Sequence, residues 1–163
     1  MAELFRVPII YTVRPVPQRL GWGGRLLALG VGLACLAVLL VGLCLKPSPA
    51  GVGSHEGLGL APCNFEQRTG LPCPTCGMTT SFSHFSHGQW LASFYVQPMG
   101  MVLAAAAAAV FWAGLYIGLT GRPAHRLLRF IPARYYLAPA LVLAIAAWAW
   151  KIWIHLRGLD GWS

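Results

Sequence analysis

Residues 26–45 read LLALGVGLACLAVLLVGLCL, a run of twenty residues without a charged side chain. A membrane's hydrocarbon core of about 30 Å is crossed by about 20 apolar residues in helical conformation. Lys46, Pro47 and Pro49 follow directly, and proline cannot continue a helix. This stretch therefore predicts a transmembrane helix that ends at Leu45.

Two further apolar stretches have a similar length. Residues 98–119 open with Pro98, which a first helical turn tolerates, and a Thr-Gly-Arg-Pro sequence follows them. Residues 136–156 contain one charge, Lys151, which lies beyond the middle of the stretch and is expected to snorkel toward the outer headgroups. The sequence predicts an all-α integral membrane protein with three transmembrane helices.

The composition agrees with lipid as the solvent. The chain of 163 residues is 57% hydrophobic and 10% charged, against about 25% charged residues in soluble domains. Three spans leave no room for a separate soluble domain. A cleaved signal peptide is an alternative for the first span, although its apolar run exceeds the usual length of about 7 to 15 residues.

The basic residues are unevenly distributed, and this predicts the orientation. The formal net charge is +8, and most arginines fall in residues 1–25 and 120–135: Arg6, Arg14, Arg19, Arg25, Arg122, Arg126, Arg129 and Arg134. The positive-inside rule makes these two segments cytoplasmic and places the loop 46–97 and the tail 157–163 outside the cell membrane. Because topology and anionic lipids explain the arginines, we expect no nucleic-acid partner.

Small residues recur every four positions in each span, and they predict close helix packing. They are Gly100, Ala104 and Ala108, Ala28 and Gly32, and Ala140 and Ala144. Such stripes let helix backbones approach one another. The spans are expected to pack together, against another membrane protein, or against a second copy of the chain.

The outer loop carries the chemistry. In its Pro72-Cys73-Pro74-Thr75-Cys76-Gly77 segment, Pro74 suits the first helical position and Cys73 the preceding cap, which predicts a helix over residues 74–87. At about 100° per residue, one side of this helix would carry polar residues and the other Met78, Phe82 and Phe85. We therefore predict an amphipathic helix lying on the membrane surface, with its polar side in solvent.

The same segment resembles a known family. The sequence Gly70-Leu71-Pro72-Cys73-Pro74-Thr75-Cys76-Gly77-Met78-Thr79, with Cys63 before it and His87-Gly88 and Gln97-Pro98 after it, is similar to a bacterial family of small membrane proteins of unknown function. That family is marked by a G-x-P-C-P-x-C-G-[LM]-T signature, and the resemblance extends over residues 63–119. It implies an architecture rather than an activity. The chain departs from the pattern at Thr80, Gln89 and Gln97, where members commonly have Arg, Asp and Asn.

Three interpretations of Cys63, Cys73 and Cys76 remain open. A structural disulfide suits an oxidising outer face and needs no cofactor. A zinc site would use the three thiolates and a fourth ligand, for which His55 is the candidate. His84 is excluded because eight helical residues separate it from Cys76 by about 12 Å. Thiol-disulfide exchange would use Cys73 and Cys76, because a C-P-x-C pair at a helix start favours a thiolate.

The predicted function follows these interpretations. The leading hypothesis is a non-enzymatic accessory or scaffold subunit, in which the cysteine site fixes the loop for a membrane-protein partner or a second copy. A membrane thiol-disulfide oxidoreductase and a metal-handling membrane protein are the alternatives. Nucleophile motifs, paired carboxylates and phosphate-binding glycine loops are missing from the sequence, so hydrolase and nucleotide chemistry are not expected.

Overall fold

A computed structural model describes residues 19–122 and 134–162 of the chain. The expectations for the terminal segment 1–18 and for residues 123–133, including Arg6, Arg14, Arg126 and Arg129, lie outside this part. The described residues form helices and no strand: α1 (Trp22–Cys44), the 3-10 helix η1 (Ser54–Leu58), α2 (Asn64–Thr69), α3 (Met78–Ser86), α4 (Trp90–Val96), α5 (Pro98–Thr120) and α6 (Arg134–Leu156).

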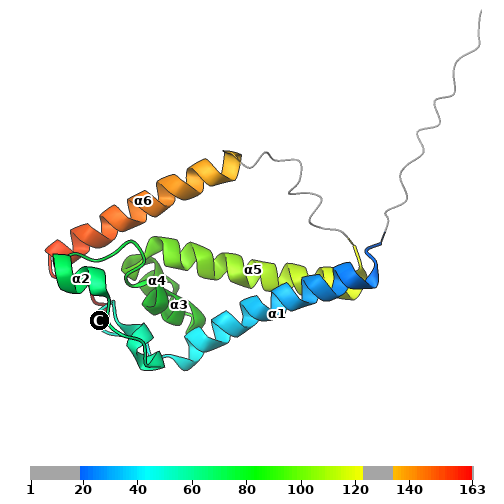
Figure 1. Ribbon diagram of the computed structural model, residues 1–163, viewed down its shortest axis with the longest axis horizontal. Helices are drawn as coiled ribbons and strands as arrows, with labels where there is room; N and C mark the ends of the chain where they lie inside the picture. Colours follow the sequence, from blue (N-terminus) through cyan, green and yellow to red (C-terminus); the bar gives the residue numbers. More distant parts are fainter. Residues whose placement is uncertain (1–18, 123–133, 163) are drawn as a thin grey trace, which may run out of the picture.

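Helices α1, α5 and α6 are each long and apolar enough to cross a membrane. This confirms the all-α class and the three predicted spans. Pro98 opens α5 in its first turn, and Gly121 ends the helix in the left-handed conformation with φ 68°. The C-terminal ends of α1 and α6 and the N-terminal end of α5 lie in the left half of Figure 1, on the same side as α2, α3 and α4.

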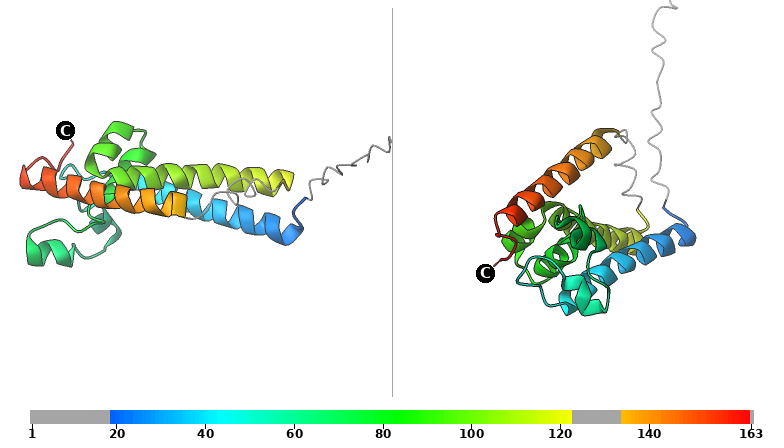
Figure 2. Two further views of the ribbon diagram at one scale, coloured as in Figure 1. Left: turned by 90° about the horizontal axis from the view of Figure 1, so that it is seen from above. Right: turned by 60° about the vertical axis from the view of Figure 1, so that its left-hand side comes forward.

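The packing of the three spans is unequal. Helices α1 and α5 make extensive contact and converge toward the N-terminal end of α1, whereas α6 contacts α5 far less (Figures 1 and 2). The predicted small residues Gly32 and Ala104 are buried, but Ala140 of α6 is exposed. Among the glycines of α5, an added Cβ would come closest to the α1 backbone at Gly114, which lies beyond the predicted stripe.

Helix α3 differs from the predicted helix over residues 74–87. It begins at Met78 and ends at Ser86. The helix starts at Met78 because the N-cap residue before it, Gly77, has the left-handed conformation with φ 83°. A side chain at Gly77 would place its Cβ 2.9 Å from the Gly51 carbonyl oxygen. The close approach of this backbone, rather than Pro74, therefore sets the start of the helix.

The polar side of α3 faces the protein instead of solvent. Thr80, Ser83 and His84 are at most 5% exposed, whereas Phe82 on the opposite side is partly exposed. Ser83 donates a hydrogen bond to the Leu45 carbonyl at 2.6 Å. Because α3 packs against α1, α4 and α5, its polar side chains meet polar groups of neighbouring segments in place of water.

Lys151 is also placed differently from the prediction. It does not snorkel outward but is fully buried, and its ammonium lies 3.1 Å from a carboxylate oxygen of Asp160. The same ammonium is 3.4 Å from the Gly51 carbonyl oxygen. His155, one turn further along α6, contacts the second Asp160 oxygen at 2.6 Å. The tail folds back and supplies the partner that the sequence alone did not assign.

Candidate metal centre

Two separate parts of the loop supply the three cysteines. Cys63 precedes α2 as its N-cap residue, and Cys73 and Cys76 lie in the turns before α3. The Cys76 amide donates to the Cys73 carbonyl at 3.0 Å, which closes the first turn and puts both side chains on one side. A short helix and a tight turn thus present their thiols to one another.

The three sulfur atoms form a compact cluster. All lie within 4.8 Å of one another, and the Sγ atoms of Cys73 and Cys76 are 3.0 Å apart. Each of the three is a free thiol. Zinc binds thiolates at about 2.3 Å, so two sulfurs in a tetrahedral site are about 3.8 Å apart. The cluster therefore needs only small shifts to hold a zinc ion, and thiolates are ligands that zinc prefers.

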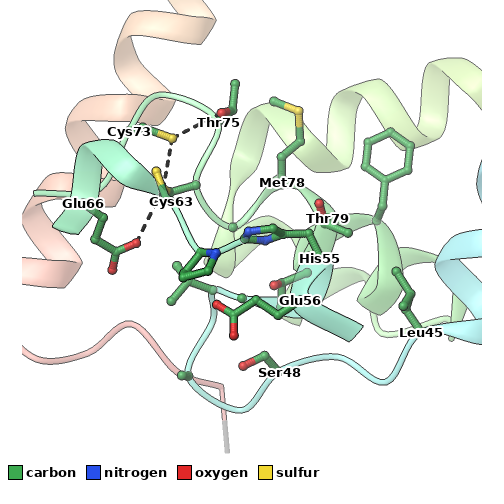
Figure 3. A pocket seen from close by; sticks show the side chains of 18 of the residues that line it. Leu45, Ser48, His55, Glu56, Cys63, Glu66, Cys73, Thr75, Met78 and Thr79 are labelled. Atoms are coloured by element: carbon green, nitrogen blue, oxygen red, sulfur yellow. Dashed lines mark hydrogen bonds between the residues drawn. The ribbon is translucent and has the colours of Figure 1, made fainter. Parts of the chain in front are cut away.

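A carboxylate stands beside the sulfurs. Oε2 of Glu66 lies 3.8 Å from Sγ of Cys76. Figure 3 shows Glu66 beside Cys63. Sequence reasoning missed this residue, although Glu66 follows Cys63 by three positions and shares its side of a helix. The predicted fourth ligand, His55, lines the same cavity, but its Nε2 is 3.2 Å from the Ala61 carbonyl oxygen. Glu66 is thus an oxygen donor in contact with the cluster.

The two cysteines of the turn differ in acidity. Burial opposes ionisation of Cys73, but hydrogen bonds from Cys76 and Thr75 outweigh it and hold the pKa of Cys73 below its ordinary value. Burial raises the pKa of Cys76, and its hydrogen bond to Cys73 adds to this rise. Cys73 is therefore the first of the pair to become a thiolate, and Cys76 keeps its proton until a metal or strong base displaces it.

Side chains from distant helices hold the turn in place. Gln97, which is fully buried, donates from Nε2 to the Pro74 carbonyl at 3.0 Å. Trp148 of α6 donates from Nε1 to the Pro72 carbonyl at 3.0 Å. Both donors bind carbonyls next to a cysteine, so they position the cluster without touching sulfur.

The other residues of the predicted motif surround the site or lie apart from it. Thr79 is partly exposed and lines the cavity beside the cysteines. His87 and Gly88 end α3 away from the sulfurs, and Pro98 starts α5. His84 is outside the cluster, as predicted, and its Nδ1 is 2.6 Å from the Gln89 side-chain oxygen.

The fold and the cluster define the class: a multi-pass, all-helical membrane protein with a three-cysteine site between its first two long helices. Residues 63–112 match a family described as protein of unknown function (DUF2752). The matched range covers a little under one third of the chain and contains the three clustered cysteines, α2, α3, α4 and about two thirds of α5. No curated protein and no solved structure matches the chain.

Proposed function

We propose that this protein is a small accessory or scaffold subunit of a membrane, in which Cys63, Cys73 and Cys76 hold one zinc ion. The convergence of three sulfurs within 4.8 Å of one another carries the proposal. A disulfide would use two of them and leave the third without a role. Zinc bound by all three ties α2 to the turn before α3 and fixes the shape of the loop for a partner.

The fourth ligand completes a closed, structural type of site. Structural zinc sites are almost always four-coordinate. Glu66 can supply an oxygen next to Cys76, and His55 is a second possible ligand that lines the same cavity (Figure 3). The proposal assigns the position to Glu66, because its carboxylate already contacts Cys76 and carries a charge that suits a cation.

The cysteine loop is proposed to lie outside the cell membrane. The N-terminal end of α1 and the C-terminal end of α5 lie away from the cysteine loop (Figure 1). Three arginines at these two ends support the orientation: Arg19, Arg25 and Arg122. Arg25 donates from Nε to the Gly118 carbonyl at 2.8 Å, so its charge is held at that end. Membrane-impermeant thiol labelling of intact cells, treated with a chelator to remove bound metal, tests the orientation. Cys73 should be labelled in intact cells, before lysis.

Metal analysis of the purified full chain tests the zinc site. Protein made with zinc in the medium should contain one zinc ion per chain. Serine in place of Cys63, Cys73 or Cys76 should reduce zinc content to a small fraction. Cys44→Ser is the matched control, because Cys44 is an exposed thiol of α1 and should leave zinc content unchanged.

Two further variants identify the fourth ligand. Glu66→Gln should lower zinc affinity about 10- to 100-fold, while His55→Ala should change it little. The opposite order would assign the fourth position to His55. Zinc content that is the same in the cysteine variants and in Cys44→Ser would refute the metal centre itself.

Thiol-disulfide exchange is the second candidate function, because the pKa of Cys73 is lowered beside a protonated Cys76. In that case Cys73 attacks a substrate disulfide, and Cys76 resolves the mixed disulfide. Cys76→Ser should then trap a covalent adduct through Cys73 that reductant releases. A zinc-loaded protein with no such adduct favours the metal centre.

A further inference from the structure

A cavity of about 950 Å³ lies beside the cysteine cluster. This is near the upper end of the volumes of small-molecule sites, which are about 300 to 1,000 Å³. The cavity is far larger than a metal ion with its ligands requires. Its walls divide into a polar part, which contains the cysteines, and an apolar part at the end of α1.

The apolar wall reaches a surface that faces lipid. It is formed by Val38, Val41 and Leu45 of α1 with Met78 and Phe82 of α3. Val38 is 52% exposed and Val41 45% exposed, on a helix apolar enough to cross a membrane. The apolar wall of the cavity therefore continues onto the exposed, apolar side of α1.

The polar wall excludes an anionic head. Its charged residues are Glu56 and Glu66, and no lysine or arginine lines the cavity in the part of the chain that the structure describes. Lys46 lies between lining residues in the sequence but is exposed and not part of the wall. Phosphate-bearing lipids would meet the Glu56 carboxylate with no lysine or arginine in the wall to balance their charge, whereas His55 and Thr79 offer hydrogen bonds to an uncharged head.

We propose that this cavity binds an uncharged, lipid-soluble molecule with an oxygen-bearing head and a long apolar chain. The chain lies on the Val38 and Val41 wall, and the head lies beside the cysteines. Isoprenoid quinones and diacylglycerols share this chemistry. The polar wall shares the three clustered cysteines and Glu66 with the proposed zinc site, whereas the apolar wall contains no zinc ligand, so lipid binding and zinc content are measured separately.

Native mass spectrometry of the full chain in detergent tests the proposal with three probes: a quinone with a ten-carbon tail, dioleoylglycerol and dioleoylphosphatidylglycerol. At least one uncharged probe should form a one-to-one complex, and the phosphatidylglycerol should bind at least tenfold more weakly. Mass under denaturing conditions separates bound quinone from quinone that has reacted with a thiol. If only one of the two uncharged probes binds, that result shows whether a quinone or a diacylglycerol is the ligand that fits.

Matched tryptophan variants locate the site. Val41→Trp fills the mouth of the cavity and should weaken binding at least tenfold. Val31→Trp is the control, because Val31 is 48% exposed on the same helix and does not line the cavity. It should stay within twofold of the unmodified chain. Val38→Trp repeats the test at a second lining position if Val41→Trp fails to fold.

Three results would overturn the proposal: equal effects of the lining and control variants, phosphatidylglycerol binding as tight as that of the uncharged probes, or quinone found only as a covalent adduct with no binding of dioleoylglycerol. Zinc content is measured on the same samples. If the unmodified chain holds zinc but binds neither uncharged probe, the cavity proposal alone is refuted. If it binds a probe but holds no zinc, the metal centre alone is refuted.

Discussion

Gly114 of α5 lies against the backbone of α1, and its replacement by alanine should move the two helices apart. A Cβ at this position would lie 2.5 Å from the Ala28 carbonyl oxygen and 3.1 Å from the Gly32 Cα. Both neighbours are backbone atoms of α1, so neither can rotate away. An ordinary contact of about 3.5 Å requires α1 and α5 to move apart locally by about 1 Å.

The expected cost follows from this displacement. Overpacking of a close-packed interface costs about 1 to 3 kcal/mol, and the helix propensity of alanine returns at most about 1 kcal/mol. Gly30 of α1 provides the matched control, because a Cβ added there would meet no atom of a neighbouring segment within 4 Å. Gly30→Ala has the propensity gain without the clash. The stability difference between the two variants should therefore be about 1 to 3 kcal/mol.

Unfolding of the purified chain by sodium dodecyl sulfate in mixed micelles measures this difference, with helical circular dichroism as the signal. Gly114→Ala should unfold at a lower fraction of the denaturing detergent than Gly30→Ala. Equal midpoints, or a higher midpoint for Gly114→Ala, would show that the backbone contact between α1 and α5 does not stabilise the fold.

Three further predictions concern the loop and the ion pair beside it. Lys151→Met should destabilise the chain by about 3 kcal/mol, because Asp160 loses its buried partner, and Lys151→Met with Asp160→Asn should recover part of the loss in the same assay. In the metal-free protein, the alkylation rate of Cys73 should reach half its maximum below pH 9, since thiolate forms above the lowered pKa, whereas Cys76 should react only at higher pH. Trp148→Phe should weaken zinc binding about tenfold by releasing the loop from α6, while a chain with unchanged zinc affinity would exclude this positioning role.

The spans were predictable because their signal is local. Runs of about 20 apolar residues bounded by proline, glycine and arginine need no knowledge of tertiary contacts. These runs predict three membrane-spanning helices, and the structure confirms three helices that are long and apolar enough to cross a membrane. Lys151 shows the limit of this reasoning, because its burial depends on Asp160, which reaches it only when the tail folds back.

The cysteine site was predictable in membership but not in detail. The spacing of Cys63, Cys73 and Cys76 indicated a shared site, and the three sulfurs do converge. The start of α3 was wrong by one turn, since the steric limit at Gly77 comes from Gly51, which lies more than twenty residues earlier. Helix rules read from neighbouring residues cannot include such a contact.

The inward polar side of α3 has a physical reason that links the fold to the site. Between helices in lipid there is no hydrophobic driving force, so hydrogen bonds and close packing decide which surfaces meet. Ser81 and Ser93 each donate to the other's carbonyl oxygen, at 2.9 and 2.8 Å, and this joins α3 to α4. Gln97, at the end of α4, then holds the Pro74 carbonyl. Polar contacts between the short helices thereby set the position of the turn that carries Cys73 and Cys76.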